Sequence, residues 1–351
     1  MSTGQVIISG IQQIGIGNTD VYRTWEWYRK NLGLDVPIFD EAAEAALMLP
    51  YTGGEPRSRH AILALNMMGG AGAEIWQYTS RVGQPAELPL QVGDLGINMA
   101  IYKSPDIEQS HKFLSQVGVC SDIESYVDDR KCLYTRDIDG NLVKIVETSD
   151  WFQKGKFHCG GVYGAVIGVS DMNTALNFYK EILGYDKVLK DTQIELSSYF
   201  SDDSTYEYRS VILTHSADRK GAFSPLLGRS EIELIQCLNR IPNQIFENRM
   251  WGDLGYIHLC FDINGMDNLR VKCNDFGSPF TVDSGDFDMG DAGGQFAYIE
   301  DPDGTLIEFV ETHRVPILKK IGWYLNLKKR NPKKPLPRWM LKAMGLNRKK
   351  D

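Results

Sequence analysis

The chain alternates short apolar stretches, typical of half-buried strands, with stretches whose apolar residues recur at helical spacing. In IQQIGIGNTDVYRTWEWYRKNLGL, Asp20 can cap a helix and Gly33 can end it. Between them, one helical face collects Val21, Trp25, Tyr28 and Leu32. The pattern predicts a strand followed by a helix over residues 21–32.

The same pattern returns 151 residues later as VYGAVIGVSDMNTALNFYKEILGY, with Asp171 as the cap and Gly184 as the stop. A second pair of stretches repeats as well, GDLGINMAIYKSPDIEQSHKFLSQVG and GDLGYIHLCFDINGMDNLRVKCNDFG. Segments with strand-like alternation follow these units, such as RHAILALN, AEIWQY, RSVILTH, IELIQC and FAYIE. The chain therefore predicts four βαβββ modules, grouped as two halves of two.

A repeated hairpin closes each half of the chain. TRDIDGNLVKIVETS and IEDPDGTLIEFVETH lie 164 residues apart, and each has an Asp-Gly turn before an alternating strand. On the same strand face, the first copy carries Lys144 and the second carries Glu308. This exchange of an ammonium for a carboxylate indicates that the two copies differ in chemistry.

The glycine-containing segment DWFQKGKFHCGG lies between the halves and is typical of a linker. We therefore expect an N-terminal domain over residues 1–150, a C-terminal domain over 151–315 and a separate tail over 316–351. The alternation of strands and helices within each module predicts an α+β fold.

Composition favours a globular, cytoplasmic protein. Of 351 residues, 42% are apolar and 24% are charged. No apolar run approaches the roughly 18 residues of a membrane span, and the start lacks a basic signal-peptide region. The six cysteines are scattered without a CxxC pair, which favours buried free thiols in a reducing compartment.

The tail differs sharply from the body in charge. Residues 319–351 hold 12 of the 38 basic residues and one of the 46 acidic ones, so the preceding chain is strongly acidic. Pro337 can start a short helix on which Trp339, Met340, Ala343 and Met344 share a face. A basic amphipathic helix can lie on an anionic membrane surface or dock on the acidic body or a partner subunit. The acidic body argues against nucleic-acid binding.

The repeated strand-Asp-helix unit ending in FYxxxLG, together with the DPDGxxIE hairpin, resembles the vicinal oxygen chelate superfamily over residues 8–313. That superfamily includes glyoxalase I, extradiol dioxygenases and bleomycin resistance proteins. The resemblance implies that two modules wrap into a half-barrel cup. It also implies that metal ligands come from the first and last strands of both modules.

In the N-terminal half, the resemblance assigns the four ligand positions to Gln13, Glu74, Met99 and Lys144. An ammonium has no lone pair to offer a cation, and a thioether is a poor ligand for a hard ion. We therefore expect this half to bind no metal, with Lys144 paired to Glu74 across the cup.

In the C-terminal half, the same positions hold Gly164, Glu233, His258 and Glu308. One imidazole and two carboxylates can hold Zn, Ni, Mn, Co or Fe with positions left open. Gly164 supplies no ligand, so water or His215 would fill that corner. We expect His258, Glu308 and Glu233 to bind a divalent metal ion, and His215 and Tyr298 to contact a small-molecule substrate.

The resemblance implies a metal-dependent lyase or isomerase of the glyoxalase type, in which Glu233 or Glu308 moves a proton of an enediolate-forming substrate. Two alternatives stay open. If His215 or His158 joined the ligand set, two histidines and one carboxylate would favour iron and a ring-cleaving dioxygenase. If no metal binds, the cups would simply sequester a small apolar molecule.

Overall fold

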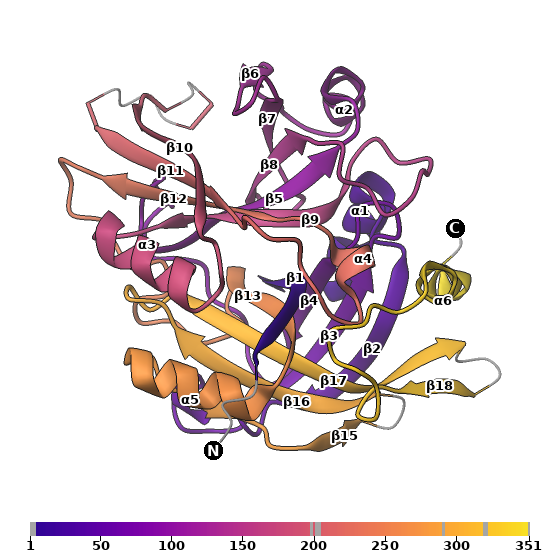
Figure 1. The fold of residues 1–351 in the computed structure, drawn as a ribbon. Coiled ribbons are helices and arrows are strands. Elements are labelled where there is room, and N and C mark those ends of the chain that lie inside the picture. The colour runs from indigo at the N-terminus through magenta and orange to yellow at the C-terminus, as the bar shows by residue number, and fades with distance from the viewer. Residues whose placement is uncertain (1–4, 197–198, 201–204, 290–291, 319–321, 350–351) are drawn as a thin grey trace.

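The computed structural model describes residues 5–196, 199–200, 205–289, 292–318 and 322–349. They form an α+β fold of four βαβββ modules (Figure 1). The first module contains β1 (Ile7–Asn18), α1 (Val21–Leu32), β2 (Val36–Glu44), the short helix η1 (Leu49–Tyr51), β3 (Ser58–Leu65) and β4 (Gly72–Tyr78). The second contains β5 (Gly96–Ser104), α2 (Ile107–Leu114), β6 (Glu124–Ser125), β7 (Lys131–Arg136) and β8 (Leu142–Glu147).

The C-terminal half repeats this order and adds a tail. The third module contains β9 (Gly160–Gly168), α3 (Met172–Glu181), β10 (Lys187–Ile194), β11 (Tyr208–Thr214), α4 (Ser224–Leu227) and β12 (Glu231–Cys237). The fourth contains β13 (Gly255–Asn264), α5 (Met266–Phe276), β14 (Val282–Asp283), β15 (Phe287–Met289), β16 (Ala292–Glu300) and β17 (Leu306–Leu318). The tail adds β18 (Trp323–Asn326), α6 (Arg338–Ala343) and η3 (Met344–Asn347).

The helix signals of the sequence are confirmed. The carboxylate of Asp20 accepts a hydrogen bond from the Arg23 N–H at 3.0 Å, and Gly33 ends α1 with a φ of 65°. The carboxylate of Asp171 caps α3 in the same way. A left-handed φ suits glycine, which has no Cβ to clash with the backbone.

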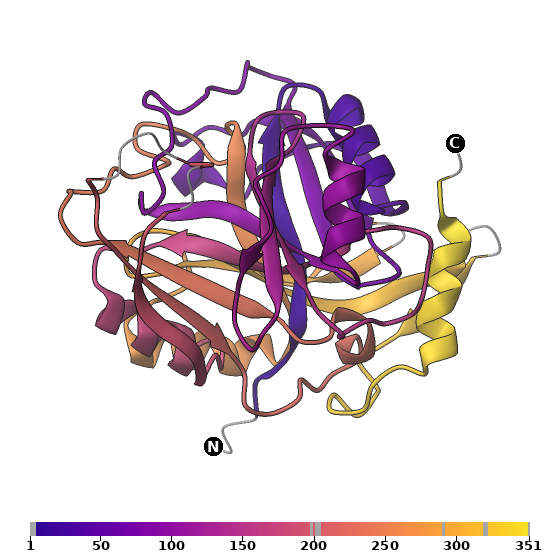
Figure 2. The ribbon, with the colours of Figure 1, turned by 90° about the horizontal axis from the view of Figure 1, so that it is seen from above.

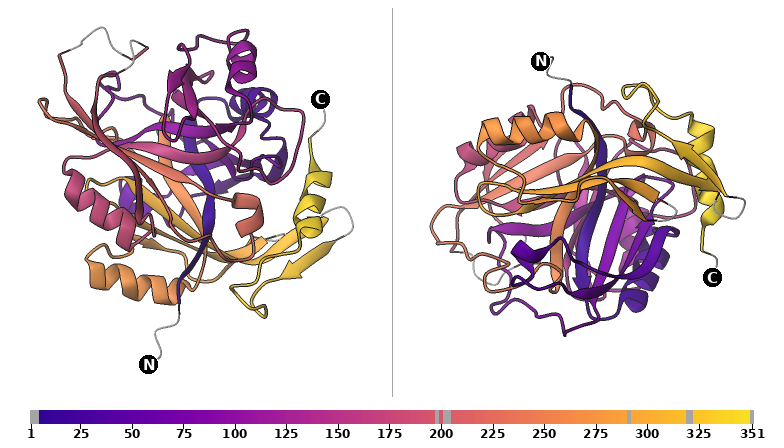
Figure 3. Two further views of the ribbon diagram at one scale, coloured as in Figure 1. Left: turned by 45° about the horizontal axis from the view of Figure 1, so that its top comes forward. Right: turned by 90° about the horizontal axis from the view of Figure 1, so that it is seen from below.

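Two curved sheets organise the modules. Sheet A runs in the order β14-β16-β17-β13-β1-β4-β3-β2, with β15 beside β16 and β18 beside β17. Sheet B runs β10-β11-β12-β9-β5-β8-β7-β6 (Figures 1 and 3). At the centre of each sheet the first strands of two modules pair antiparallel, and each is flanked by the parallel last strand of its own module.

The sheets join modules in a different way from the expected halves. Sheet A combines the first and fourth modules, whereas sheet B combines the second and third. Each cup therefore crosses the predicted division at residue 150, and the expectation of one cup within each half is corrected. Backbone hydrogen bonds are alike for any apolar partner strand, so the repeats alone do not specify which modules share a sheet.

The two modules of each half remain connected through their repeated motifs. The Tyr28 hydroxyl on α1 donates to Asp137 Oδ2 in the hairpin of the second module, at 2.7 Å. The Tyr179 hydroxyl on α3 donates to Asp301 Oδ2 in the hairpin of the fourth module, at 2.9 Å. The repeated helix tyrosine and hairpin aspartate are therefore two ends of one contact, formed twice.

One large apolar cluster takes residues from all four modules, from both sheets and from the tail. Two smaller clusters line the cups. The one in sheet A includes Trp76, Trp251 and Tyr298, and the one in sheet B includes Met99, Tyr126 and Tyr163. The cup floors are thus packed and rigid, which suits precise placement of side chains.

The tail docks on the body of the protein and lies at its edge (Figure 2). Pro337 precedes α6 as predicted, and Met340, Ala343 and Met344 of the predicted face pack against the core together with Leu341. Trp339, predicted on the apolar face, is 58% exposed and stacks on Trp323 instead. Among the described helices, none is both long enough and apolar enough to cross a membrane.

Candidate metal centre in the sheet A cup

Four polar side chains converge on the concave face of sheet A, one from each of its four central strands. They are Gln13 on β1, Glu74 on β4, His258 on β13 and Glu308 on β17, and all four are buried. These strands are the first and last strands of the first and fourth modules. The pairing of β1 with β13 therefore assembles a complete set of donor residues from opposite ends of the chain.

The donor atoms lie close enough to share one centre. One ligand atom from each of Glu74, His258 and Glu308 lies within 4.8 Å of the others. His258 Nε2 is 3.1 Å from Glu308 Oε2 and 3.5 Å from Glu74 Oε2. The Gln13 amide nitrogen donates to the same two carboxylates, at 3.2 and 3.4 Å.

The predicted grouping of Glu233 with His258 and Glu308 is wrong. Glu233 lies on β12 in sheet B, where its Oε2 is 2.5 Å from the ammonium of Lys144 and its Oε1 accepts from Ser210. The predicted pairing of Lys144 with Glu74 is wrong for the same reason. The prediction assumed that each glutamate lies in a cup formed by its own half of the chain. In the structure, Glu74 joins the cup that contains His258 and Glu308, and Glu233 joins the cup that contains Lys144.

Gly164 is the sheet B counterpart of Gln13, and the fold leaves no room for a ligand there. A Cβ at this position would lie 1.7 Å from the backbone oxygen of Glu231 on the neighbouring strand. Gly164 needs no substitute ligand in sheet A, because Gln13 occupies the equivalent corner of that cup. This resolves the incomplete ligand set that the sequence presented.

Aromatic rings and a glycine pack closely around the imidazole of His258. Its ring is stacked on Trp251, with centroids 6.3 Å apart, and meets Tyr298 edge-on at 5.5 Å. A Cβ at Gly15 would lie 2.3 Å from His258 Cε1. Gly15 therefore makes room for the imidazole. The sequence analysis did not identify Gly15, because it is one of several glycines on β1 and nothing in the pattern distinguishes it from the others.

Burial and mutual repulsion control the charges of the carboxylates. Burial and the neighbouring Glu308 charge raise the pKa of Glu74. Burial also acts to raise the pKa of Glu308, but the charge and hydrogen bond of His258 outweigh it and lower that pKa. The His258 pKa rises in return, because the attraction of Glu308 overcomes burial. Glu308 is thus the firmly ionised member and Glu74 the one closer to holding a proton.

The other predicted site residues divide into two cases. Tyr298 lines the sheet A cavity and lies beside Glu308, with which its hydroxyl interacts. His215 lies at the end of β11, lines neither cup, and directs Nδ1 to the Ala217 carbonyl at 2.8 Å. His215 is not in the donor group, so the expectation that it completes the ligand set is wrong, and neither cup supports its predicted contact with a substrate. His158 packs against Phe113 and is not in the ligand group.

A cavity of about 460 Å³ opens over the donor group. Glu74, Glu308, Gln13 and Tyr298 form its polar floor, and apolar side chains form most of its walls. A cavity of this size is typical of small-molecule sites. The donors therefore face a space that a substrate can enter.

The donor set fits a divalent metal ion. Two carboxylates, one imidazole and an amide are ligand types that Zn, Ni, Mn, Co and Fe accept. Gln13 Oε1 is buried without a hydrogen-bond partner, and His258 Nε2 lies against the two carboxylates, at 3.1 and 3.5 Å. Rotation of the Gln13 amide about its terminal bond would turn its oxygen towards the two carboxylates. A bound cation would also relieve the repulsion between Glu74 and Glu308.

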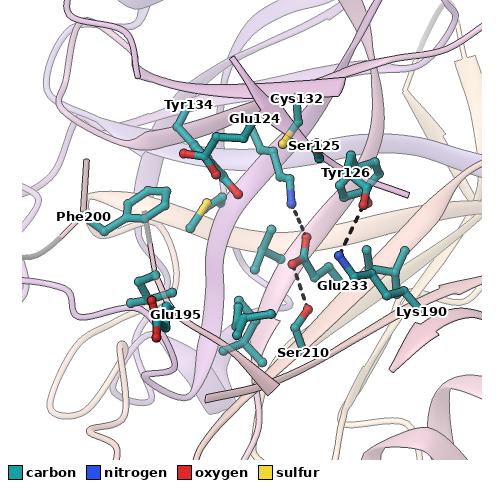
Figure 4. Close-up of a pocket in the computed structure, with 17 residues that line it drawn as sticks. Glu124, Ser125, Tyr126, Cys132, Tyr134, Lys190, Glu195, Phe200, Ser210 and Glu233 are labelled. Atoms are coloured by element: carbon teal, nitrogen blue, oxygen red, sulfur yellow. Dashed lines mark hydrogen bonds and ion pairs between the residues drawn. The ribbon is translucent and has the colours of Figure 1, made fainter. Parts of the chain in front are cut away.

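The second cup carries a different chemistry (Figure 4). Its cavity of about 240 Å³ is lined by Tyr126, Tyr134, Ser210 and Glu233 among others. In this view Glu233 lies near the centre, with Ser210 below it and Phe200 to the left. The ammonium of Lys144 faces the rings of Tyr126 and Tyr134, at 4.4 and 5.4 Å from their centroids. An internal ion pair therefore occupies the position of the donor group.

Comparison with known proteins supports this assignment of the fold. Residues 158–309 match the family model of the Glyoxalase/Bleomycin resistance protein/Dioxygenase superfamily. Over this stretch of the chain, the match confirms the resemblance predicted from the repeats. No curated protein matches the sequence.

Solved structures extend the likeness to most of the chain. Glyoxalase I from Zea mays is 12% identical, with a TM-score of 0.51 over 88% of this chain and 92% of that one. A Bacillus subtilis protein that bears a provisional dioxygenase name is 12% identical, with a TM-score of 0.51 over 87% of this chain and 86% of that one. At such identities the likeness shows the fold alone, so function must be argued from the site.

Proposed function

We propose that the protein is a metal-dependent lyase or isomerase of the glyoxalase type, acting on a small oxygenated substrate in the sheet A cup. One observation carries the proposal. Glu74, His258 and Glu308 offer ligand atoms within 4.8 Å of one another at the floor of a cavity. This reassigns the site from the C-terminal half to a cup shared by both halves.

Glu74, His258 and Glu308 would hold the ion, and Gln13 could add a fourth ligand. When bound, a divalent ion polarises neighbouring oxygens of a substrate and stabilises negative charge that develops on them. His258 is fixed in orientation by Trp251, so it is suited to hold rather than to move.

Glu74 is the best candidate to move a proton. In the metal-free protein, burial and the Glu308 charge raise the pKa of Glu74, so of the two carboxylates Glu74 takes up a proton more readily. Glu308 is less suited, because His258, Cys260 and Tyr298 all stabilise its charge. Glu74 would take a proton from a carbon beside a carbonyl, leaving the bonding electrons in an enediolate. Return of the proton to the adjacent carbon, with transfer of the hydroxyl proton to the neighbouring oxygen, completes an isomerisation without an oxidant.

The donor set argues against the dioxygenase alternative. Ring cleavage would favour two histidines and one carboxylate, whereas the donor group within the described residues has a single histidine. The metal-free binding alternative has support only in the sheet B cup, where Lys144 and Glu233 neutralise each other.

Elemental analysis of protein purified without added metal tests the proposal, with about one divalent ion expected per chain. The second measurement is solvent-deuterium exchange at the carbon beside the carbonyl of small 2-hydroxy ketones, followed by NMR. Glu74→Gln should abolish exchange and weaken metal binding, because it removes the base and one of the three ligands, and Glu233→Gln should leave both exchange and metal content unchanged. Iron with oxygen uptake on catechols would replace the proposal with ring cleavage. Metal-free protein of unchanged thermal stability after chelator treatment would replace it with ligand sequestration.

We also propose that the protein works in the cytoplasm. All six cysteines are free thiols, which supports a reducing compartment. A peripheral membrane contact through the tail has less support, because Leu341 and Met344 are already covered by the body. Co-sedimentation with anionic lipid vesicles would reverse this preference.

A further inference from the structure

The cavity above the donor group is more apolar than a metal centre requires. Its walls come from distant parts of the chain, and they include Phe39, Leu63, Leu65, Leu226, Val310 and Met344. These side chains lie on β2, β3, α4, β17 and η3. The fold therefore places hydrocarbon on several sides of the space that a substrate would fill.

Two cationic groups on these walls, those of Arg59 and Arg314, already contact other parts of the protein. Arg59 donates to the Glu41 backbone oxygen at 3.1 Å and to the Glu41 carboxylate at 3.3 Å. The Arg314 guanidinium lies over the ring of Tyr324, at 5.6 Å from its centroid. Transfer of a strongly charged substituent into this space would lose hydration, whereas an apolar substituent would gain from burial.

The C-terminal tail supplies part of the wall through Met344, which is 3% exposed. Several contacts fix the tail in place. Arg348 forms an ion pair with the buried Asp35 at 2.7 Å, and the Lys349 N–H donates to the Asp35 carbonyl at 2.8 Å. The Leu336 N–H donates to the Ala222 carbonyl just before α4. The tail is thus an integral wall of the cavity.

We propose that the substrate carries a hydrocarbon chain attached to its oxygenated head, and that Met344, as part of the cavity wall, limits the size of this chain. The head would lie at Glu74, His258 and Glu308, a placement that rests on the proposed function. The chain would lie between the apolar walls of sheet A and the tail. The placement of the chain depends on the cavity alone and not on the metal.

The test is a series of straight-chain 2-hydroxy acids of four to ten carbons, measured by calorimetry on the full-length protein. Burial of one methylene contributes about 0.8 kcal/mol, so affinity should rise about fourfold for each added carbon. The rise should stop at the length that fills the cavity. Equal affinity across the series would overturn the proposal.

Substitution of Met344 localises the effect. Met344→Trp reduces the space, so it should weaken the ten-carbon acid at least tenfold and leave the four-carbon acid unchanged. Met344→Ala enlarges the space and should extend the rise to longer chains. Leu346, two residues away and 67% exposed, provides the matched control Leu346→Trp, which should change neither acid. The same loss in both tryptophan variants would overturn the role of Met344.

Repeating the series on chelator-treated protein separates this proposal from the metal proposal. If the head binds at a metal ion, chelation should weaken all acids by a common factor while the increment per carbon persists. A persistent increment without any effect of chelation would leave the hydrocarbon site intact and contradict the metal proposal. If metal is bound but affinity does not increase with chain length, the metal proposal would stand and the hydrocarbon site would be contradicted.

Discussion

The two cups are built from equivalent strands and differ at the same four positions. Where sheet A has Gln13, Glu74, His258 and Glu308, sheet B has Gly164, Glu233, Met99 and Lys144. Only one of the four positions holds the same residue type in both cups. It is occupied by Glu74 in sheet A and by Glu233 in sheet B. In sheet A this glutamate faces an imidazole and a second carboxylate, and in sheet B it faces an ammonium.

This difference shows that one buried carboxylate can serve two purposes. Glu233 is satisfied by Lys144 and Ser210, so it contributes to a stable and unique packing of its cup. Among the described residues, no lysine or arginine forms an ion pair with Glu74, and the pKa of Glu74 is raised. The carboxylate of the sheet A cup therefore remains available for metal binding or proton transfer, whereas that of the sheet B cup is neutralised by an internal ion pair.

The largest effect should come from removal of the imidazole. His258→Ala deletes one of three converging donors, so metal affinity should fall at least about 100-fold. Activity should fall about 1,000-fold or more, because a catalytic ion contributes several kcal/mol. Metal titration and exchange rates measure both. The matched change in sheet B, Met99→Ala, should alter neither, and metal loss in that variant would contradict the distinction between the cups.

Breaking the ion pair of sheet B should be the next largest effect. Lys144→Met leaves Glu233 buried and unpaired, which should lower the free energy of unfolding by about 3–5 kcal/mol. The double variant Lys144→Met with Glu233→Leu should recover most of this loss, since both charges are then removed. Urea unfolding measures the difference. A double variant as unstable as the single one would show that packing, not charge, dominates this cup.

Filling the space beside the imidazole should have an intermediate effect. Gly15→Val places a side chain against the His258 ring and should weaken metal binding about 10- to 100-fold, in the range of other changes that misorient a ligand. Val166 is the sheet B counterpart of Gly15. Val166→Gly should leave metal affinity at the wild-type value. Unchanged affinity in Gly15→Val would mean that the imidazole is not a ligand.

The smallest effect concerns the shared glutamate and depends on pH. The raised pKa of Glu74 means that the folded, metal-free protein resists its ionisation. This penalty is absent below the ordinary pKa of about 4.3 and grows as pH rises through the raised pKa. Glu74→Gln should therefore stabilise chelator-treated protein at pH 8 but not at pH 4. Glu233→Gln should destabilise it at pH 8, because Lys144 loses its partner. If the two variants changed the melting temperature at pH 8 in the same direction, the proposed difference between the two glutamates would be contradicted.

The sequence by itself determined the modules and their local structure. Asp20 and Gly33 fixed the ends of α1. The repeated tyrosines marked equivalent points in the first and third modules, and the repeated Asp-Gly hairpins did so in the second and fourth. The sequence also identified the residue types at all eight ligand positions. These features depend on contacts near in the chain or on repeats, so they can be read without a tertiary structure.

Only the tertiary structure decided which of these positions meet. The sequence favoured neighbouring modules, which would have put His258 and Glu308 beside Gly164 and Glu233. The fold instead pairs β1 with β13 and brings Gln13 and Glu74 to the same two residues. Strand pairing is made by backbone groups that every strand possesses, and the choice of partner follows from packing of the whole core. The donor set was therefore visible in the sequence, but its assembly was not.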